Sequence, residues 1–126
     1  MIRYLRALPF KAGCEVGGVQ FLLCHAAPSS PLFEYRAADS ELWSGDPAGW
    51  SGVVLTGHTH LPFQRTYAGK IVVNPGSVGQ PKNGRAEACY AVWQDAGLRS
   101  DRSRTRWRRP SRSYATFRCR RLSSKI

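Results

Sequence analysis

Three histidines, His25, His58 and His60, are the side chains of this sequence best suited to do chemistry. They are its only histidines, and each follows closely on a run of apolar, β-type residues. Neutral imidazole binds zinc, iron, manganese or nickel, and residues at strand ends converge where sheets bind ligands. Each histidine taken alone is more typical of a surface or hydrogen-bonded loop residue than of a metal ligand. The shared position of all three at strand ends favours a metal site.

Two turn-rich segments surround these histidines. In Gly57-His58-Thr59-His60, two imidazoles spaced i, i+2 can serve two adjacent metal ions, and Gly57 allows a close backbone approach. Residues 74–79 read Asn-Pro-Gly-Ser-Val-Gly, and we expect this loop to be mainly structural because its residue types serve turn chemistry. Ser77 lacks the Gly-x-Ser-x-Gly surroundings of a hydrolase nucleophile. We therefore expect its hydroxyl to satisfy loop backbone.

Short elements must position these residues. The apolar patterns predict strands at residues 19–24, 52–56, 63–67, 70–73 and 87–93, and short helices at 2–8 and 36–43. Pro9 ends the first helix, and Ala68-Gly69 joins two strands in a hairpin. The strand 87–93 is apolar on both faces, which predicts a position inside a sheet that is covered on two sides.

The basic residues are concentrated at one end of the chain. The 126 residues carry a net charge of +11, and eleven of the nineteen Lys and Arg residues, but one of the eight acidic residues, lie in 97–126. This Arg/Ser-rich, aperiodic tail is expected to be disordered or the product of a frameshift. Nucleic-acid binding is the alternative, because Trp107, Tyr114 and Phe117 alternate with arginines.

Several classes of protein are excluded by composition. No apolar run approaches the roughly 18 residues that a membrane span needs, and the first residues do not form a signal peptide. The four cysteines form no Cys-x-x-Cys pair, which leaves buried, reduced thiols as the expectation. We therefore expect a cytoplasmic protein without a membrane partner.

Four segments together resemble a known family. They are residues 53–62 with Gly57-His58-Thr59-His60, residues 74–81 with Asn-Pro-Gly-Ser, the pair His25 and Pro28, and the strand 87–93. Residues 2–95 resemble the C-terminal half of a calcineurin-like metallophosphoesterase, in the compact bacterial and archaeal phosphodiesterase branch. The resemblance implies an α/β fold, a partial αββα sandwich. Residues 1–96 would form its C-terminal, strand-rich half, and 97–126 a separate basic tail.

The resemblance also implies a site and an activity. His25 and His58 would bind one divalent metal ion and His60 a second, the metals being manganese, iron, zinc or nickel. Such a dinuclear metal centre hydrolyses phosphate esters, so the implied substrate is a small-molecule phosphate ester or a phosphodiester.

Three blocks of the family pattern do not occur in this sequence. They are Asp-x-His, an upstream Gly-Asp, and Gly-Asn-His followed by an acid, which would supply a bridging carboxylate and further ligands. Gly45-Asp46 follows His25, out of family order, and is expected to be a turn after a helix. Without carboxylates, three imidazoles are expected to hold metal weakly. We therefore predict an incomplete, inactive fragment with no catalytic residue of its own; the alternative is a non-catalytic scaffold or interaction protein.

Overall fold

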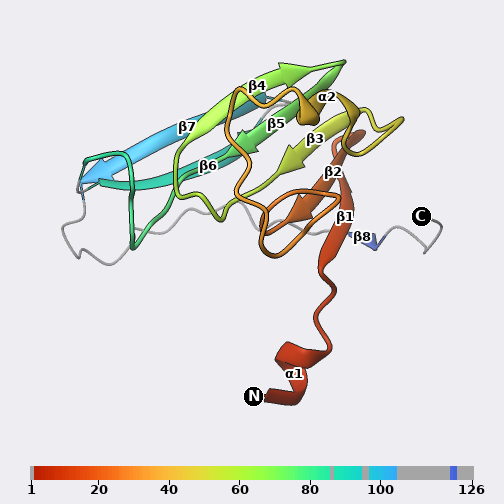
Figure 1. Cartoon of the computed structure of the whole chain (residues 1–126), viewed down its shortest axis with the longest axis horizontal. Helices are drawn as coiled ribbons and strands as arrows, with labels where there is room; N and C mark the ends of the chain where they lie inside the picture. The colour runs from red at the N-terminus through yellow and green to blue at the C-terminus, as the bar shows by residue number, and fades with distance from the viewer. Residues whose placement is uncertain (1, 86, 95–96, 105–119, 122–126) are drawn as a thin grey trace.

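The computed structural model describes residues 2–85, 87–94, 97–104 and 120–121, the last two ranges as backbone. Its main feature is a mixed six-stranded sheet in the order β4-β5-β3-β2-β1-β8, accompanied by the two-stranded sheet β6-β7 (Figure 1). The strands are β1 (Lys11–Val16), β2 (Val19–Cys24), β3 (Gly52–Leu55), β4 (Phe63–Tyr67), β5 (Lys70–Asn74), β6 (Glu87–Gln94), β7 (Gly97–Arg104) and β8 (Arg120–Arg121), and the helices are α1 (Ile2–Arg6) and α2 (Leu42–Gly45).

The centre of the large sheet is parallel. β2 pairs in parallel with β3, and β3 with β5, in a register that aligns Leu23 with Leu55 and Leu55 with Val73. β1 and β4 pair antiparallel with β2 and β5 on either side. Because the three central strands run the same way, their carboxyl ends lie at one edge of the sheet. Cys24, Leu55 and Asn74 end these strands, so the segments that follow begin close together.

Apolar side chains cover both faces of the large sheet. On one face Leu22, Val54 and Val72 pack with Ala27 and Trp43 from the connection between β2 and β3. On the other face lie Cys14, Phe21, Val53 and Val73, against which Ala91 and Trp93 of β6 pack. The rings of Phe21 and Trp93 meet edge to face with 4.9 Å between centroids. Two β layers and one outer layer containing α2 thus form a partial α/β sandwich, as the fold prediction stated.

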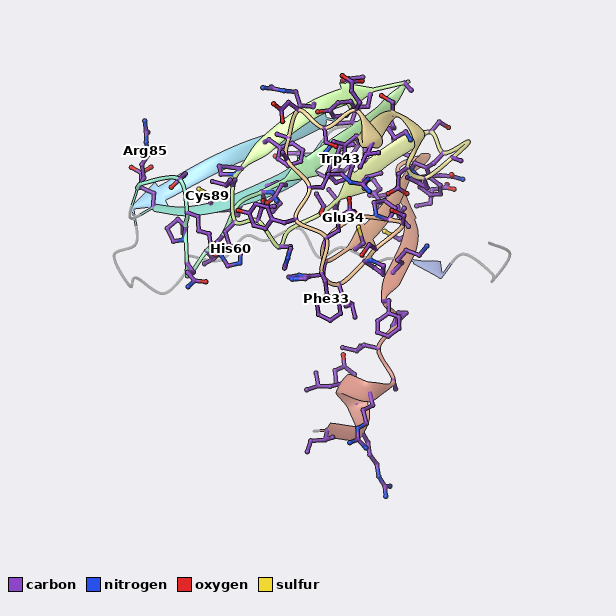
Figure 2. The ribbon with its side chains drawn as sticks, in the orientation of Figure 1. Phe33, Glu34, Trp43, His60, Arg85 and Cys89 are labelled. Atoms are coloured by element: carbon purple, nitrogen blue, oxygen red, sulfur yellow. The ribbon has the colours of Figure 1, made fainter. Side chains whose placement is uncertain are left out.

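The outer layer is visible in Figure 2, where Trp43 lies against the sheet and Phe33 points away from it. α1 projects from the rest of the described chain (Figure 1), and none of its residues is buried. Within the described ranges, no helix is long and apolar enough to cross a membrane.

Most of the predicted strands are present with the expected bounds or within one residue of them. The hairpin of β4 and β5 has Ala68 and Gly69 at its turn, both with positive φ. The sequence analysis did not predict β1, because Lys11–Val16 contains few apolar residues. It forms through pairing with β2 across Gly17 and Gly18, whose φ angles are 58° and 77°.

The helix predicted at 36–43 was wrong. Here the backbone makes tight turns, with Trp43 N bonded to Ser40 O at 3.2 Å, and a helix exists only at Leu42–Gly45. The indole Nε1 of Trp43 donates to Ala37 O at 2.8 Å. This contact occupies a carbonyl that a continuous helix would have used, and burial of the large indole outweighs local helical periodicity.

The disorder expected from residue 97 onward does not hold for the first part of that segment. Gly97–Arg104 is β7, which pairs antiparallel with β6 from Gln94↔Gly97 to Glu87↔Arg104. Backbone hydrogen bonds to β6 need no apolar alternation, which explains why the sequence pattern missed this strand. Among the described residues β6 has this one strand partner, so it does not lie inside a sheet as predicted, although Ala88 and Cys89 are buried. Trp107, Tyr114 and Phe117 lie outside the described residues.

Gly52 allows a close approach of β3 to β2. Its φ is 128°, and a Cβ at this position would lie 2.5 Å from the backbone oxygen of Gln20. We predict that Gly52→Ala lowers the free energy of unfolding by about 2–4 kcal/mol, because neither backbone yields cheaply. Gly45→Ala is the matched control, since a Cβ added there would meet no neighbouring segment within 4 Å. Equal urea midpoints for both variants would contradict the prediction.

Candidate functional site

The candidate site lies where the backbone hydrogen bonds between the parallel strands β2, β3 and β5 continue into the loops that follow them. Gly57 N donates to His25 O at 2.9 Å, and Thr56 N donates to Val73 O at 2.9 Å. The Thr56 hydroxyl also donates to Ala26 O. These bonds extend the register of the sheet by two residues, and they fix the start of each histidine-bearing loop relative to the other.

His25 and His58 meet directly at this edge. Nδ1 of His58 lies 3.0 Å from Nε2 of His25, and the two rings cross at 71° with 4.9 Å between centroids. His25 is exposed and His58 is partly buried. In neutral imidazoles, one ring nitrogen donates and the other accepts. The two facing nitrogens can therefore share a proton or, when both are unprotonated, bind one cation together.

The turn that presents His58 is strained. Thr59 N donates to Gly57 O at 2.6 Å across His58, and both His58 and His60 have φ of 59°. A three-residue turn with positive φ at its centre is rare and unfavourable for a residue with a Cβ. Gly57 was expected to be needed for a close approach of the backbone to the site. A Cβ at this position would lie 3.5 Å from His25 O, which is an ordinary contact, so the structure does not require glycine here. The strain falls on the histidines, as is common at functional sites.

The buried side chain of Asn74 stabilises the turn at His58. Its side chain is 2% exposed, and its Nδ2 donates to Gly57 O at 2.6 Å and to Thr59 Oγ1 at 2.9 Å. Its Oδ1 accepts from Gly76 N at 2.9 Å. The prediction that this loop is structural is confirmed, but its role as a clamp on the histidine turn was missed. A polar amide at the end of the apolar strand β5 was the available signal.

His60 does not join the histidine pair. Its Nδ1 lies 2.8 Å from Gln80 O, and Lys82 N donates to His60 O at 3.4 Å. The loop that follows β5 therefore packs against His60 at two points. Gln80 N donates to Ser77 Oγ at 2.9 Å, so the Ser77 hydroxyl satisfies loop backbone as predicted.

The donor set fits one metal ion better than two. Two nitrogens that each bind one metal at about 2.1 Å lie roughly 3 Å apart at right angles and roughly 3.4 Å apart at the tetrahedral angle of zinc. The 3.0 Å between the His25 and His58 nitrogens is close to this range. In the described part of the chain, no three His, Cys, Asp or Glu side chains gather closely enough to hold a metal. Burial raises the pKa of Cys24 to about 11, so the thiol beside His25 stays protonated at neutral pH and is a poor ligand. These residues do not fit a dinuclear centre, which needs carboxylates.

A charged cluster shapes the loop that passes the histidine pair. The Asp46 carboxylate accepts from Ser29 N at 3.0 Å, from Ser29 Oγ at 2.8 Å and from Arg36 Nη1 at 2.7 Å. Arg36 also pairs with Glu34 at 2.6 Å and stacks over the Trp43 ring. Burial by itself would raise the pKa of Asp46, but the hydrogen bonds from Ser29 and Arg36 outweigh it and lower that pKa. Asp46 ends α2, as predicted, and also ties residues 29–36 together.

Asn74→Ala tests the clamp. We predict a loss of about 2–3 kcal/mol in unfolding free energy, because the variant leaves the Gly57 carbonyl and the Thr59 hydroxyl without their buried donor. Amide hydrogen exchange at Thr59 should become faster than exchange in β3. Asn83→Ala, in the loop after β5, is the control and should leave Thr59 exchange unchanged. Unaltered exchange at Thr59 in Asn74→Ala would refute the clamp.

Asp46→Asn tests the charged cluster through its pH dependence. A carboxyl with a lowered pKa in the folded state stabilises the fold above its unfolded pKa near 3.8, and this contribution is lost as pH falls through the folded pKa. At pH 7 we expect the variant to be less stable by about 1–2 kcal/mol, with the difference shrinking below pH 4. Asp39→Asn, at an exposed carboxyl, should show no such trend in urea unfolding. A pH-independent difference for Asp46→Asn would contradict the assignment.

Comparison with known proteins agrees with this fold. Solved structures that share the fold include a metallophosphoesterase from Sphaerobacter thermophilus (TM-score 0.69, 22% identity, 83% of this chain and 51% of that one). A hypothetical protein from Pyrococcus horikoshii is similar to a comparable degree (TM-score 0.67, 18% identity, 83% of this chain and 44% of that one). At these identities the likeness establishes the fold alone.

Sequence relatives extend the comparison. An uncharacterised protein of Methanocaldococcus jannaschii is 27% identical over 110 residues, which covers 75% of this chain and 44% of the relative. A "probable metallophosphoesterase" of Mycoplasma pneumoniae is 30% identical over 76 residues, covering 60% of this chain and 47% of the relative. The chain thus spans about half the length of the curated relatives it matches. Residues 3–95 match the calcineurin-like phosphoesterase superfamily domain, and the chain belongs to that superfamily.

Proposed function

We propose that this chain supplies the histidine ligands of a metal-dependent phosphoesterase site. In this proposal His25 and His58 bind one divalent cation, and His60 would serve a second only where carboxylate ligands complete the site. The single observation that supports it best is the 3.0 Å approach of the His25 and His58 ring nitrogens at the carboxyl ends of two parallel strands. Membership of the phosphoesterase superfamily makes a phosphate ester the substrate class, and divalent metals are typical of the family.

The chain's own residues would orient and preorganise this side of the site. Asn74 and the strained turn fix the backbone around His58, and the bond from Gly57 N fixes the backbone of His25. Preorganised ligands lose little entropy on binding a cation. A bound divalent cation would supply charge stabilisation for the phosphate. His60, whose Nδ1 faces Gln80 O, can offer Nε2.

We do not expect turnover by this chain alone. A dinuclear phosphoesterase centre requires carboxylates to balance the charge of two cations, and among the described residues no carboxylate joins His25 and His58 in a group of three ligands. We propose that this polypeptide is an incomplete site which binds one cation and does not hydrolyse esters by itself. Hydrolysis would require carboxylate ligands from additional polypeptide.

Titration with Zn²⁺ tests the metal proposal. We predict one equivalent bound by the full chain, with a Kd at least about tenfold higher in His25→Ala and in His58→Ala, because each change removes one of two donors. His60→Ala should bind with nearly unchanged affinity and is the matched control. Isothermal titration calorimetry measures all four proteins. Equal affinity of the His58→Ala and His60→Ala variants would contradict the pairing.

The same preparations test the predicted lack of turnover. With Mn²⁺ or Zn²⁺ present, hydrolysis of an activated phosphodiester should not exceed the rate with metal alone. Metal-dependent turnover that disappears in His58→Ala would show that this chain is a complete enzyme and would overturn the proposal of an incomplete site.

A further inference from the structure

Tyr35 lies beside the histidine pair on its solvent side. Its ring meets the His58 ring at 66° with 5.9 Å between centroids. Its hydroxyl donates to Thr59 O at 3.4 Å, within the histidine turn. Even so, 58% of the residue is exposed. An aromatic ring that is attached at its hydroxyl and left open to solvent offers a fixed apolar surface next to His58.

Lys82 extends this arrangement. Its Nζ lies 6.0 Å from the Tyr35 ring centroid, within cation–π range. Its backbone is held by the bond from Lys82 N to His60 O, while the neighbouring Gln80 carbonyl meets the His60 ring. The ion pairs among the described residues involve Arg36 and do not involve Lys82. The ammonium group therefore keeps its charge available to a ligand.

These residues form a row that comes from four separate segments. In order they are His25 after β2, His58 in the turn after β3, Tyr35 in the connection before α2, and Lys82 in the loop after β5. The row runs from two metal-binding side chains through an aromatic ring to a cation. A ligand that spans it meets a phosphate-binding end, a flat apolar surface and a positive charge in turn.

We propose that Tyr35 and Lys82 form a selectivity arm that recognises the part of a bound ester beyond its phosphate group. The matching ligand is a phosphate ester whose organic group is flat and carries a second negative charge. Aromatic surfaces stack on a tyrosine ring, and an ammonium attracts an anion. This inference rests on the proposed function, because it places the phosphate group at the cation that His25 and His58 would hold.

The test compares three probes that differ by one feature each. Inorganic phosphate has neither feature, phenyl phosphate has the flat ring, and 4-carboxyphenyl phosphate has both the ring and the second charge. Their Kd values are measured by NMR titration of the full chain in the presence of one equivalent of Zn²⁺. We expect affinity to rise from the first probe to the third.

Two substitutions separate the roles. Tyr35→Leu should weaken both aromatic phosphates by about three- to tenfold and leave inorganic phosphate unchanged. Lys82→Gln should weaken 4-carboxyphenyl phosphate by about threefold or more, to the affinity of phenyl phosphate, since it removes the charge and keeps a side chain of similar length. The controls Tyr4→Leu and Arg65→Gln, at exposed positions in α1 and β4, should change none of the three. Equal binding of all probes, or insensitivity to both substitutions, would overturn the proposed arm.

His58→Ala distinguishes failure of the arm from failure of the site. If inorganic phosphate binds equally to the original chain and to His58→Ala, the proposed phosphate position is wrong, and the arm proposed to extend from it fails as well. If His58→Ala abolishes phosphate binding while Tyr35→Leu and Lys82→Gln leave every probe unaffected, the site stands and the arm alone is wrong.

Discussion

The parallel pairing of β2, β3 and β5 is the constraint on which the rest of this structure depends. Parallel strands direct their carboxyl ends to one edge, and the register of Leu23, Leu55 and Val73 continues into the bond from Gly57 N to His25 O. Apolar layers cover both faces of these strands. Burial of these faces opposes any slip in register, because a slip of one residue would turn the apolar side chains to the wrong face.

The histidine turn shows how a stable sheet supports an unfavourable local conformation. Positive φ at His58 and His60 costs free energy, and the buried amide of Asn74 offsets part of that cost by bonding the turn at Gly57 and Thr59. The clamp itself lies at the end of β5, so the sheet, the clamp and the turn act as one unit. The imidazoles are consequently held in place before any ligand arrives.

Charge distribution explains why this arrangement suggests binding more strongly than catalysis. Two acidic groups of the connection between β2 and β3, Asp46 and Glu34, both pair with Arg36. They stabilise the connection that carries Tyr35, and within the described ranges no carboxylate joins His25 and His58 to form a group of three metal ligands. A chain that spans about half of its relatives thus presents imidazoles, an aromatic ring and an ammonium group, but not the anionic ligands that a pair of cations requires.

The sequence by itself determined the strands that end at the histidines, the β4–β5 hairpin, the structural nature of the Asn74 loop and the family resemblance. Each of these follows from periodicity, turn residues or motifs that are local in the chain. Only the tertiary structure decided that His58 faces His25, 33 positions away, while His60 faces Gln80. It also placed Tyr35 beside His58 and Lys82 beside Tyr35, and made Gly97–Arg104 a strand. Those contacts depend on strand register and loop packing between distant segments, which no local pattern encodes.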